Sequence, residues 1–321
     1  MTARRHHFVP QCYLRSFAVP RKAGKYQLHV FDRQTGKTFQ TATENIALER
    51  DFNRVDVEGH PSDALEAGLA AFEGQLAPAL ERTRDAAAFQ SDEDKNLIFN
   101  LIGNLGLRNP RWRESMRQFH EDSTKAMMDL ALASKERWDG QIRKAVQNNA
   151  FAEKPEITYE EMKEFHEGDQ YKIALDSGYR LRMEMDMLDT VLPLLARRKW
   201  MFLKAPINSG GFITSDHPVC LMWSEPGRNG PFNSPGFGLH GTELVMPLSP
   251  KLALVGAFEI DDGVKEVSEP VVEITNGMVA GFTTRQAYSR DLHFRYRFQD
   301  GEGARKASRL IDDARFIRRK E

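Results

Sequence analysis

The residues of this chain that are best suited to chemistry stand near its start, where His6 and His7 are adjacent. Imidazole titrates near neutral pH, so a histidine can act as a general base, a general acid or a metal ligand. Because adjacent residues of a strand point to opposite faces, both rings reach one site only where the backbone is irregular. We therefore expect one catalytic or metal-ligating histidine with one structural partner. A purely structural pair is the alternative.

A second candidate lies in residues 214–218, where Ser215 and Asp216 precede a histidine and a proline. Short oxygen-bearing side chains between two apolar strands present a carboxylate at the end of a sheet. We predict that Asp216 is catalytic, acts on His6 or His7, and shares a metal with His7, while Ser215 binds substrate. The alternative is an Asx turn, in which Asp216 accepts backbone N–H bonds.

Arginines supply the third kind of group. Arg108 and Arg111 flank the helix-breaking pair Asn109-Pro110, and Arg15 follows the two histidines. A guanidinium group suits bidentate contact with phosphate or carboxylate, so these three residues are predicted to bind substrate. An ordinary helix start is the alternative for the segment around Arg108. Asn276 is predicted to fix either a substrate or a backbone carbonyl.

Two acidic residues give a weaker signal. Glu66 and Glu73 are seven residues apart in a segment with helical periodicity, so they share one helix face. Surface helices often show the same pattern. The chain contains no Walker-type phosphate loop, no Cys-x-x-Cys or His-Glu-x-x-His motif and no Gly-x-Ser-x-Gly elbow. A structural zinc site and serine hydrolase chemistry are therefore not expected.

The elements that must position these residues change in kind along the chain. Alternating patterns predict strands at residues 26–31 and 38–41 and again between 200 and 260, with a further short strand at residues 8–9. The order predicts an α+β fold with a central mixed or antiparallel sheet formed from the N-terminal hairpin and the strands of residues 200–260. A large helical insertion and C-terminal helices complete it. The predicted helices begin near Ser62 and Ser91, run through 111–146, begin again at a capping box of Thr158 and Glu161, and cover 181–195, 271–288 and 304–319.

We expect one domain over residues 1–321. Its sub-regions are 1–60, with the N-terminal motif and hairpin, the helical region 61–197, and 198–321, which is rich in strands.

The composition narrows the class of protein further. A hydrophobic fraction of 40% and a charged fraction of 28% are typical of a globular protein in water. No run of about 20 apolar residues and no secretory signal is present, so we expect no membrane partner. Cys12 and Cys220 cannot form a disulfide framework, which favours a cytoplasmic protein. The net charge of −1 gives no global attraction to nucleic acid, but both ends of the chain are basic. They would form a positive face if they meet, and two solvated surfaces if they do not.

The segment His-His-Phe-Val-Pro-Gln-Cys-Tyr-Leu-Arg-Ser-Phe at residues 6–17 resembles the opening signature of a widespread, mostly bacterial family, the domain of unknown function 4238. The resemblance spans most of the chain, and its segments 6–17 and 212–219 are the most specific. Where the family favours Asn after Ser-Asp, this chain has His217, so the resemblance favours Asp216 over His217. It also leads us to expect an aromatic near the position of Asn53. Weaker matches lie at 44–47, 64–66, 108–111, 246–250 and Asn276.

Together these residues predict a phosphodiester hydrolase of the nuclease kind, acting in phage defence or toxicity. One of His6 and His7 would be the base or a ligand, Asp216 would orient it or bind Mg²⁺ or Mn²⁺, and the arginines would hold phosphate. The predicted partner is nucleic acid or a nucleotide. One alternative is a non-catalytic module that binds a nucleotide, nucleic acid or small anion. The other is a structural knot in which His6, Arg15 and Asp216 tie the N-terminus to the sheet.

Overall fold

The computed structural model describes residues 5–148, 150, 156–169, 171–225, 227–228, 233–298 and 303–317. The chain divides into two compact units. Unit 1 consists of Met1–Pro110 and Leu181–Glu321, and unit 2 of Arg111–Arg180. Unit 2 is smaller than the predicted helical sub-region 61–197, because two long helices before Pro110 belong to unit 1. The single domain expected over the whole chain stays a prediction.

The N-terminal motif of unit 1 folds as a short strand, a link and a short helix. β1 (Arg5–His7) pairs antiparallel with β5 (Leu48–Arg50). Pro10 then occupies the N-cap of α1 (Gln11–Arg15). The strand predicted at residues 8–9 is wrong, since the ladder with β5 ends at His7 and the chain turns into α1 at the proline.

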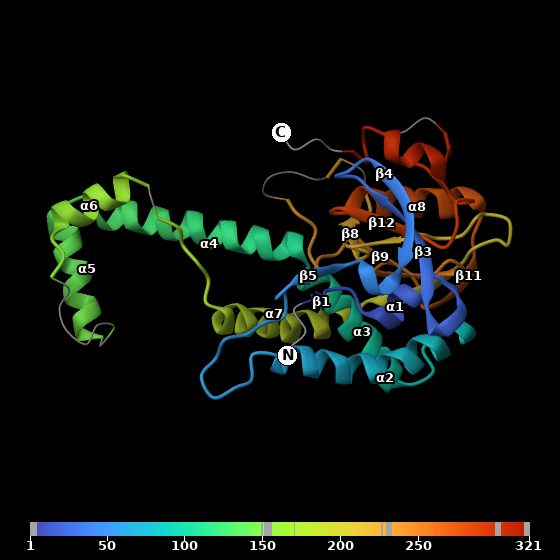
Figure 1. Cartoon of the computed structure of the whole chain (residues 1–321), viewed down its shortest axis with the longest axis horizontal. Coiled ribbons are helices and arrows are strands. Elements are labelled where there is room, and N and C mark those ends of the chain that lie inside the picture. Colours follow the sequence, from blue (N-terminus) through green and yellow to red (C-terminus); the bar gives the residue numbers. More distant parts are fainter. Residues whose placement is uncertain are drawn as a thin grey trace. The chain divides into compact units, whose positions relative to one another are not determined.

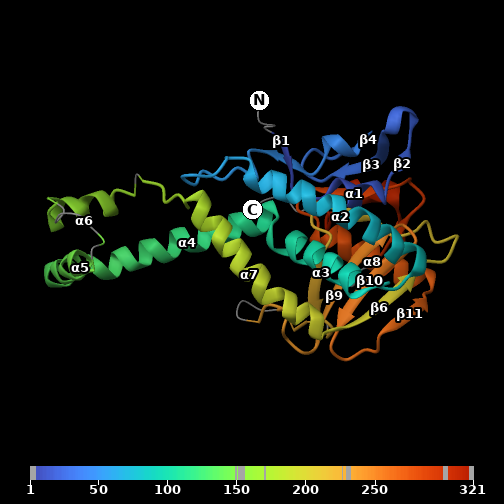
Figure 2. The same cartoon turned by 90° about the horizontal axis from the view of Figure 1, so that it is seen from below.

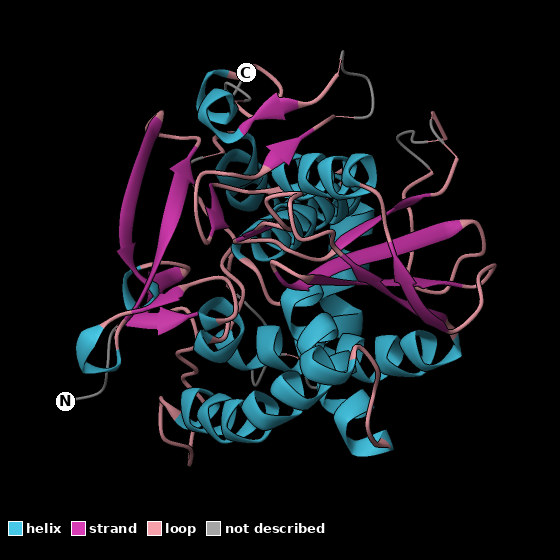
Figure 3. Cartoon of the chain, turned by 90° about the vertical axis from the view of Figure 1, so that its right-hand side faces the viewer, coloured by secondary structure: helices cyan, strands magenta, loops and turns pink. Residues whose placement is uncertain are grey.

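The α+β class is confirmed, but the strands do not form one central sheet. The described residues form two five-stranded sheets, which Figure 3 shows as separate groups of arrows. One sheet has the order β11-β6-β10-β9-β8, and the other has the order β2-β3-β12-β7 with β4 added on β3. The predicted hairpin is confirmed in β3 and β4. Bounds are β2 (Val19–Pro20), β3 (Tyr26–Asp32), β4 (Lys37–Ala42), β6 (Lys199–Lys204), β7 (Thr214–Ser215), β8 (Cys220–Trp223), β9 (Thr242–Ser249), β10 (Leu252–Ala257), β11 (Gly263–Glu266) and β12 (Gln286–Ser289).

The predicted helix over 271–288 ends early. α8 (Glu269–Phe282) stops before Thr283, and the chain returns as β12 between β3 and β7. The buried residues that α8 contributes pack with side chains of both sheets, such as Phe31 and Val245. The helix predicted at 304–319 is also wrong, because that segment forms β14 (Arg305–Lys306), paired with β13 (Arg295–Tyr296), and the 3₁₀ turn η3 (Ala307–Asp312).

The two ends of the described chain come together in unit 1, since η3 contacts β3. The Arg33 guanidinium also donates to the Phe316 carbonyl at 2.6 Å. Basic residues before Arg5 and after Ile317 lie outside the described residues, so the predicted positive face stays a prediction.

Three long helices frame the N-terminal motif. α2 (Ala64–Ala86) packs on α1 and on α3 (Asp92–Leu107), as Figures 1 and 2 show. α3 begins as predicted, because the Ser91 hydroxyl accepts the Asp94 amide. α7 (Ser177–Arg197) starts in unit 2 and continues into unit 1. The 3₁₀ turns of this region are η1 (Lys22–Gly24) and η2 (Thr43–Asn45).

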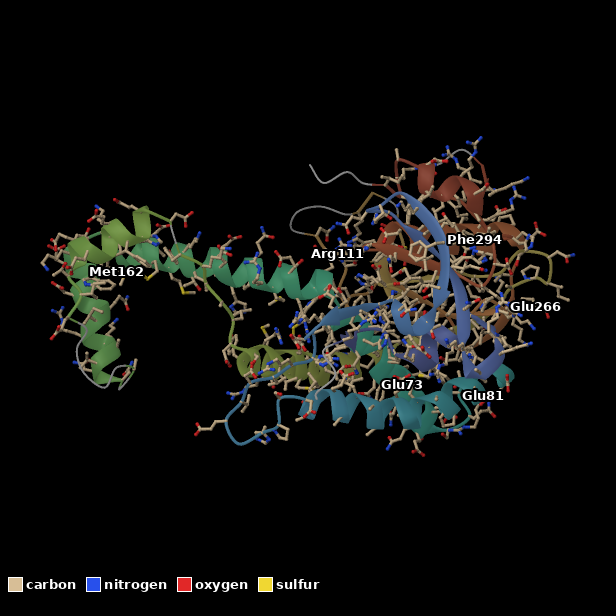
Figure 4. The ribbon with its side chains drawn as sticks, in the orientation of Figure 1. Glu73, Glu81, Arg111, Met162, Glu266 and Phe294 are labelled. Carbon is tan, nitrogen blue, oxygen red and sulfur yellow. The ribbon has the colours of Figure 1, made fainter. Side chains whose placement is uncertain are left out.

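Unit 2 is helical. The stretch predicted over 111–146 is two helices, α4 (Pro110–Ala131) and α5 (Lys135–Gln147), because Ser134 caps a new helix. The predicted capping box of Thr158 with Glu161 is confirmed at the start of α6 (Tyr159–Glu167), which carries Met162 (Figure 4). No helix among the described residues is long and apolar enough to cross a membrane.

Candidate functional site

A pocket of about 100 Å³ lies in unit 1 beside the N-terminal motif. We call it the His7 pocket. The link between β1 and α1 forms one side, and α2, which carries Glu73 (Figure 4), and the end of α3 form the others. Its volume is well below the roughly 300 Å³ at which drug-sized ligand sites begin, so only a small group fits inside. The lining residues are His7, Phe8, Pro10, Phe52, Asn53, Glu66, Leu69, Ala70, Phe72, Glu73, Asn104 and Arg108.

The ring of His7 is held by contacts to its Nδ1 atom. Its Nδ1 lies 3.2 Å from the carbonyl oxygen of Ile46. The amide nitrogen of Gln11 also lies 3.0 Å from this Nδ1. A carbonyl can only accept and an amide NH₂ can only donate, so the two contacts require opposite roles of Nδ1, and each suits one tautomer of the ring. Burial lowers the pKa of His7 below 6.5, although the Ile46 carbonyl and the charges of Glu73 and Glu66 oppose that shift. His7 is therefore neutral at pH 7 and can accept a proton.

A glutamine supports the same ring from the first turn of α1. The amide nitrogen of Gln11 donates to the Thr43 carbonyl at 3.0 Å, and it lies 3.0 Å from Nδ1 and 3.4 Å from Nε2 of His7. Ile46 and Gln11 thus hold the ring in one orientation.

Two carboxylates face His7 from α2. Asn53 Nδ2 donates to Glu66 Oε2 at 2.7 Å, and the Cys12 amide donates to Glu73 Oε1 at 2.6 Å. Both side chains are half-buried. An ionised carboxylate offers about four lone-pair sites, so these bonds leave acceptor capacity toward the pocket. Burial and Glu73 together raise the pKa of the Cys12 thiol to about 12, so the thiol stays protonated.

A buried network sets the position of these groups. The Arg108 guanidinium donates from Nε to Glu184 at 3.0 Å and from Nη2 to Asn53 Oδ1 at 2.9 Å, and Nη1 bonds Asn104 at 3.0 Å. Asn53 in turn holds Glu66. Because protein partners occupy all three nitrogens of Arg108, its geometry fits a positioning role better than the predicted role in binding a substrate anion.

His6 faces a different environment from His7. Its side chain is only 3% exposed, and its Nδ1 accepts the backbone amide of Asn53 at 2.9 Å. The two rings point to different sides of the strand. His6 thereby anchors the loop that presents Asn53, and it does not line the His7 pocket.

Asp216 lies in another place. Its Oδ1 accepts the Thr284 amide at 2.8 Å, and its Oδ2 accepts the amides of Arg285 and Gln286 at 2.7 and 2.9 Å. Burial raises the pKa of Asp216 to about 6, and these three donors oppose the shift. The carboxylate therefore ties β7 to the turn before β12. It bonds neither histidine, so the predicted pairing of Asp216 with His6 or His7, and the metal shared with His7, have no counterpart in this geometry.

The other predicted residues are not among those that line the pocket. Ser215 Oγ accepts the His217 amide at 3.0 Å. Arg15 is exposed, with its guanidinium 5.3 Å from the centre of the Tyr26 ring. Arg111 belongs to unit 2. The predicted knot of His6, Arg15 and Asp216 is therefore not assembled.

Asn276 is buried and holds backbone groups in place, which is one of the two roles predicted for it. Its Oδ1 accepts the Ile213 amide at 2.9 Å. Its Nδ2 donates to the carbonyls of Gly211 and Arg295 at 3.0 and 2.8 Å.

The chain belongs to the family described as Protein of unknown function (DUF4238), whose model matches residues 5–293. The match covers the His7 pocket, both five-stranded sheets and α8. The comparisons with curated proteins and with solved structures gave no match.

Three residues of the site were not singled out from the sequence. Gln11 lies inside the N-terminal motif, so its position near the two histidines could have been used to predict it as a site residue. Asn53 was noted only because an aromatic was expected near it, yet its amide connects Arg108 with Glu66. Glu184 lies far along the chain and carries no local signal.

Proposed function

We propose that the chain is a phosphodiester hydrolase whose reaction takes place in the His7 pocket. The observation that carries this proposal is the convergence of a neutral imidazole with two carboxylates, Glu66 and Glu73, around one small cavity. Enzymes that hydrolyse phosphodiesters commonly combine an acid–base residue with groups that bind a cation.

In the proposed reaction, His7 is the general base. The unprotonated nitrogen of its ring takes a proton from a water molecule, and the water oxygen forms a bond to phosphorus. The bond from phosphorus to the leaving oxygen breaks, and solvent protonates that oxygen. A positioned base of this kind contributes about 10² to 10⁴-fold to the rate.

The two carboxylates lead us to propose a divalent cation as the cofactor. Glu66 and Glu73 would repel an anionic phosphodiester, while Arg108 is already neutralised by Glu184. A divalent cation removes this repulsion. Mg²⁺ is commonly bound by one or two carboxylates together with water and substrate oxygens, and Mn²⁺ accepts the same ligands. No group of three His, Cys, Asp or Glu side chains forms a ready metal site in the described residues, so substrate oxygens would complete the coordination.

The test is a cleavage assay on the full chain. Single- and double-stranded DNA and RNA are incubated with Mg²⁺, with Mn²⁺ or with a chelator, and the products are separated on a gel. We expect cleavage that depends on the cation and falls about 10²-fold or more in His7→Ala. The matched control is His60→Ala, because His60 is exposed and outside the pocket.

Two results would contradict the proposal. One is no cleavage of any of the four substrates with either cation. The other is a His7→Ala variant that cleaves as fast as the His60→Ala control.

A further inference from the structure

A second hollow of unit 1 is much larger, with a volume of about 1350 Å³. We call it the basic groove. It is formed by the end of α2, the segment after β6, the turn between β9 and β10, the end of β11 and the segment after β12. Figure 4 labels Glu266 at its β11 side. The lining residues are Arg84, Lys204, Ala205, Pro206, Ile207, Asn208, Gly210, Gly211, Pro250, Lys251, Leu252, Glu266, Val267, Arg290, Asp291 and His293.

Positive charge dominates this lining. Arg84, Lys204, Lys251 and Arg290 are cationic, against the two acids Glu266 and Asp291. Within the described residues, no carboxylate lies in ion-pair distance of any of the four cations. Such unpaired charges in a concave surface create a positive potential that attracts an anion.

The groove has a rigid frame. Gly210 and Gly211 have φ values of +74° and +79°, and a Cβ on them would lie 2.4 Å from the His293 carbonyl oxygen and 2.5 Å from that of Pro250. Asn276 also holds the carbonyl of Gly211. Close backbone packing therefore fixes the wall between the cations, so that little conformational entropy is lost when a ligand binds.

The chemistry of the lining defines a class of ligand. The volume exceeds the 300 to 1000 Å³ or so of small-molecule sites, which suits a segment of a polymer. His293 supplies the only aromatic ring in the described lining, so stacking with bases contributes little. We propose that the basic groove binds the phosphate backbone of a nucleic acid strand, without reading its sequence.

This inference rests on the proposed function, for which the groove would hold the substrate. α2 connects the two places, because it carries Glu73 in the His7 pocket and Arg84 in the groove. Eleven residues of helix span about 17 Å, which is about five nucleotides at 3.4 Å each. The Arg84 guanidinium also bonds the hydroxyl of Ser16, just after α1. A short strand can therefore reach from the groove to the pocket.

The experiment measures binding without cleavage. A fluorescent 20-nucleotide DNA strand, and the same sequence as RNA, are titrated with Glu73→Gln, and the anisotropy is followed at several salt concentrations. If the four cations each neutralise one phosphate, the slope of log K against log salt is about −2.8. In Lys204→Gln/Lys251→Gln made on the same background, we expect the slope to become shallower by about 1.4. The matched control is Lys22→Gln/Lys37→Gln, which removes two exposed charges elsewhere in unit 1.

The outcomes separate the two proposals. The groove proposal is overturned if Lys204→Gln/Lys251→Gln leaves the slope and the Kd unchanged. It is also overturned if Lys22→Gln/Lys37→Gln weakens binding by as much. Competition by polyglutamate as strong as that by an unlabelled strand overturns recognition of phosphate. Binding that follows the groove charges, together with a wild-type chain that cleaves no nucleic acid, supports the groove and contradicts the hydrolase.

Discussion

The Asp216 cluster and the His7 pocket both contain acids, but the protein uses those acids in different ways. Asp216 accepts three backbone N–H groups and is only 5% exposed at the buried strand end. Glu66 and Glu73 are half-buried beside a cavity, and each accepts one of the nitrogen donors described above. A buried carboxylate that bonds three backbone amides holds the fold together, whereas a carboxylate beside a cavity, with acceptor capacity left, can bind and react.

The most direct test of this difference is to neutralise Glu66 and Glu73. If Glu66 and Glu73 hold the cation, Glu66→Gln and Glu73→Gln each reduce cleavage by about 10²-fold or more, because an amide carries no charge to bind it. The melting temperature changes little, since Gln keeps an oxygen that can accept the same amide. Glu81→Gln is the matched control, as Glu81 lies exposed on the same helix (Figure 4). An equal loss of cleavage in Glu81→Gln and Glu73→Gln would contradict a catalytic role specific to the His7 pocket.

The opposite behaviour is expected of Asp216. Asp216→Asn places an NH₂ group against backbone donors, so we expect a loss of about 3 kcal/mol in the free energy of unfolding. For a chain of 321 residues, the melting temperature falls by about 4 to 5 °C. Thermal unfolding followed by circular dichroism measures the shift. A variant that melts like the wild type but has lost cleavage would show that Asp216 is catalytic after all.

The pH profile probes the imidazole of the pocket. Because burial lowers the pKa of His7 below 6.5, a base role predicts kcat/KM that is flat above pH 6.5 and falls about tenfold per pH unit below the lowered pKa. The unfolded chain binds this proton more tightly, so the contribution to stability is present above pH 6.5 and is lost as pH falls through the folded pKa. Rates measured between pH 4.5 and 8 test this. An inflection above 6.5 would point to another base.

The smallest effect is expected at Arg15. Its exposed guanidinium over Tyr26 contributes about 0.5 to 1 kcal/mol of stability. Arg15→Ala should therefore lower the melting temperature by a few degrees at most, with a cleavage rate within about twofold of the wild type. A loss of cleavage as large as that of Glu73→Gln would restore the predicted role of Arg15 in substrate binding.

Local patterns predicted the fold better than they predicted its assembly. The hairpin of β3 and β4 and the capping box of α6 follow from a few adjacent residues, and both are confirmed. β12 was missed because its four residues gain stability from pairing with β3 and β7, which lie far away in the chain. For the same reason the division of the strands over two sheets could not be derived from their order alone.

The candidate site shows the same limit. His7 was identified from its type, and Glu66 with Glu73 from their spacing, although helix spacing does not reveal what faces a helix. Asp216 was a correct prediction of an acid at a strand end. Its partners, however, are the amides of residues 284–286, and a sequence gives no signal for backbone donors that distant.

The ion pair of Arg108 with Glu184 also has a topological consequence. The chain leaves unit 1 after Pro110 and returns to it at Leu181. The ion pair therefore joins the end of α3, just before unit 2, to α7, just after it. Because Arg108 also bonds Asn53, the points where the chain leaves and re-enters unit 1 are joined within unit 1 and not only through unit 2.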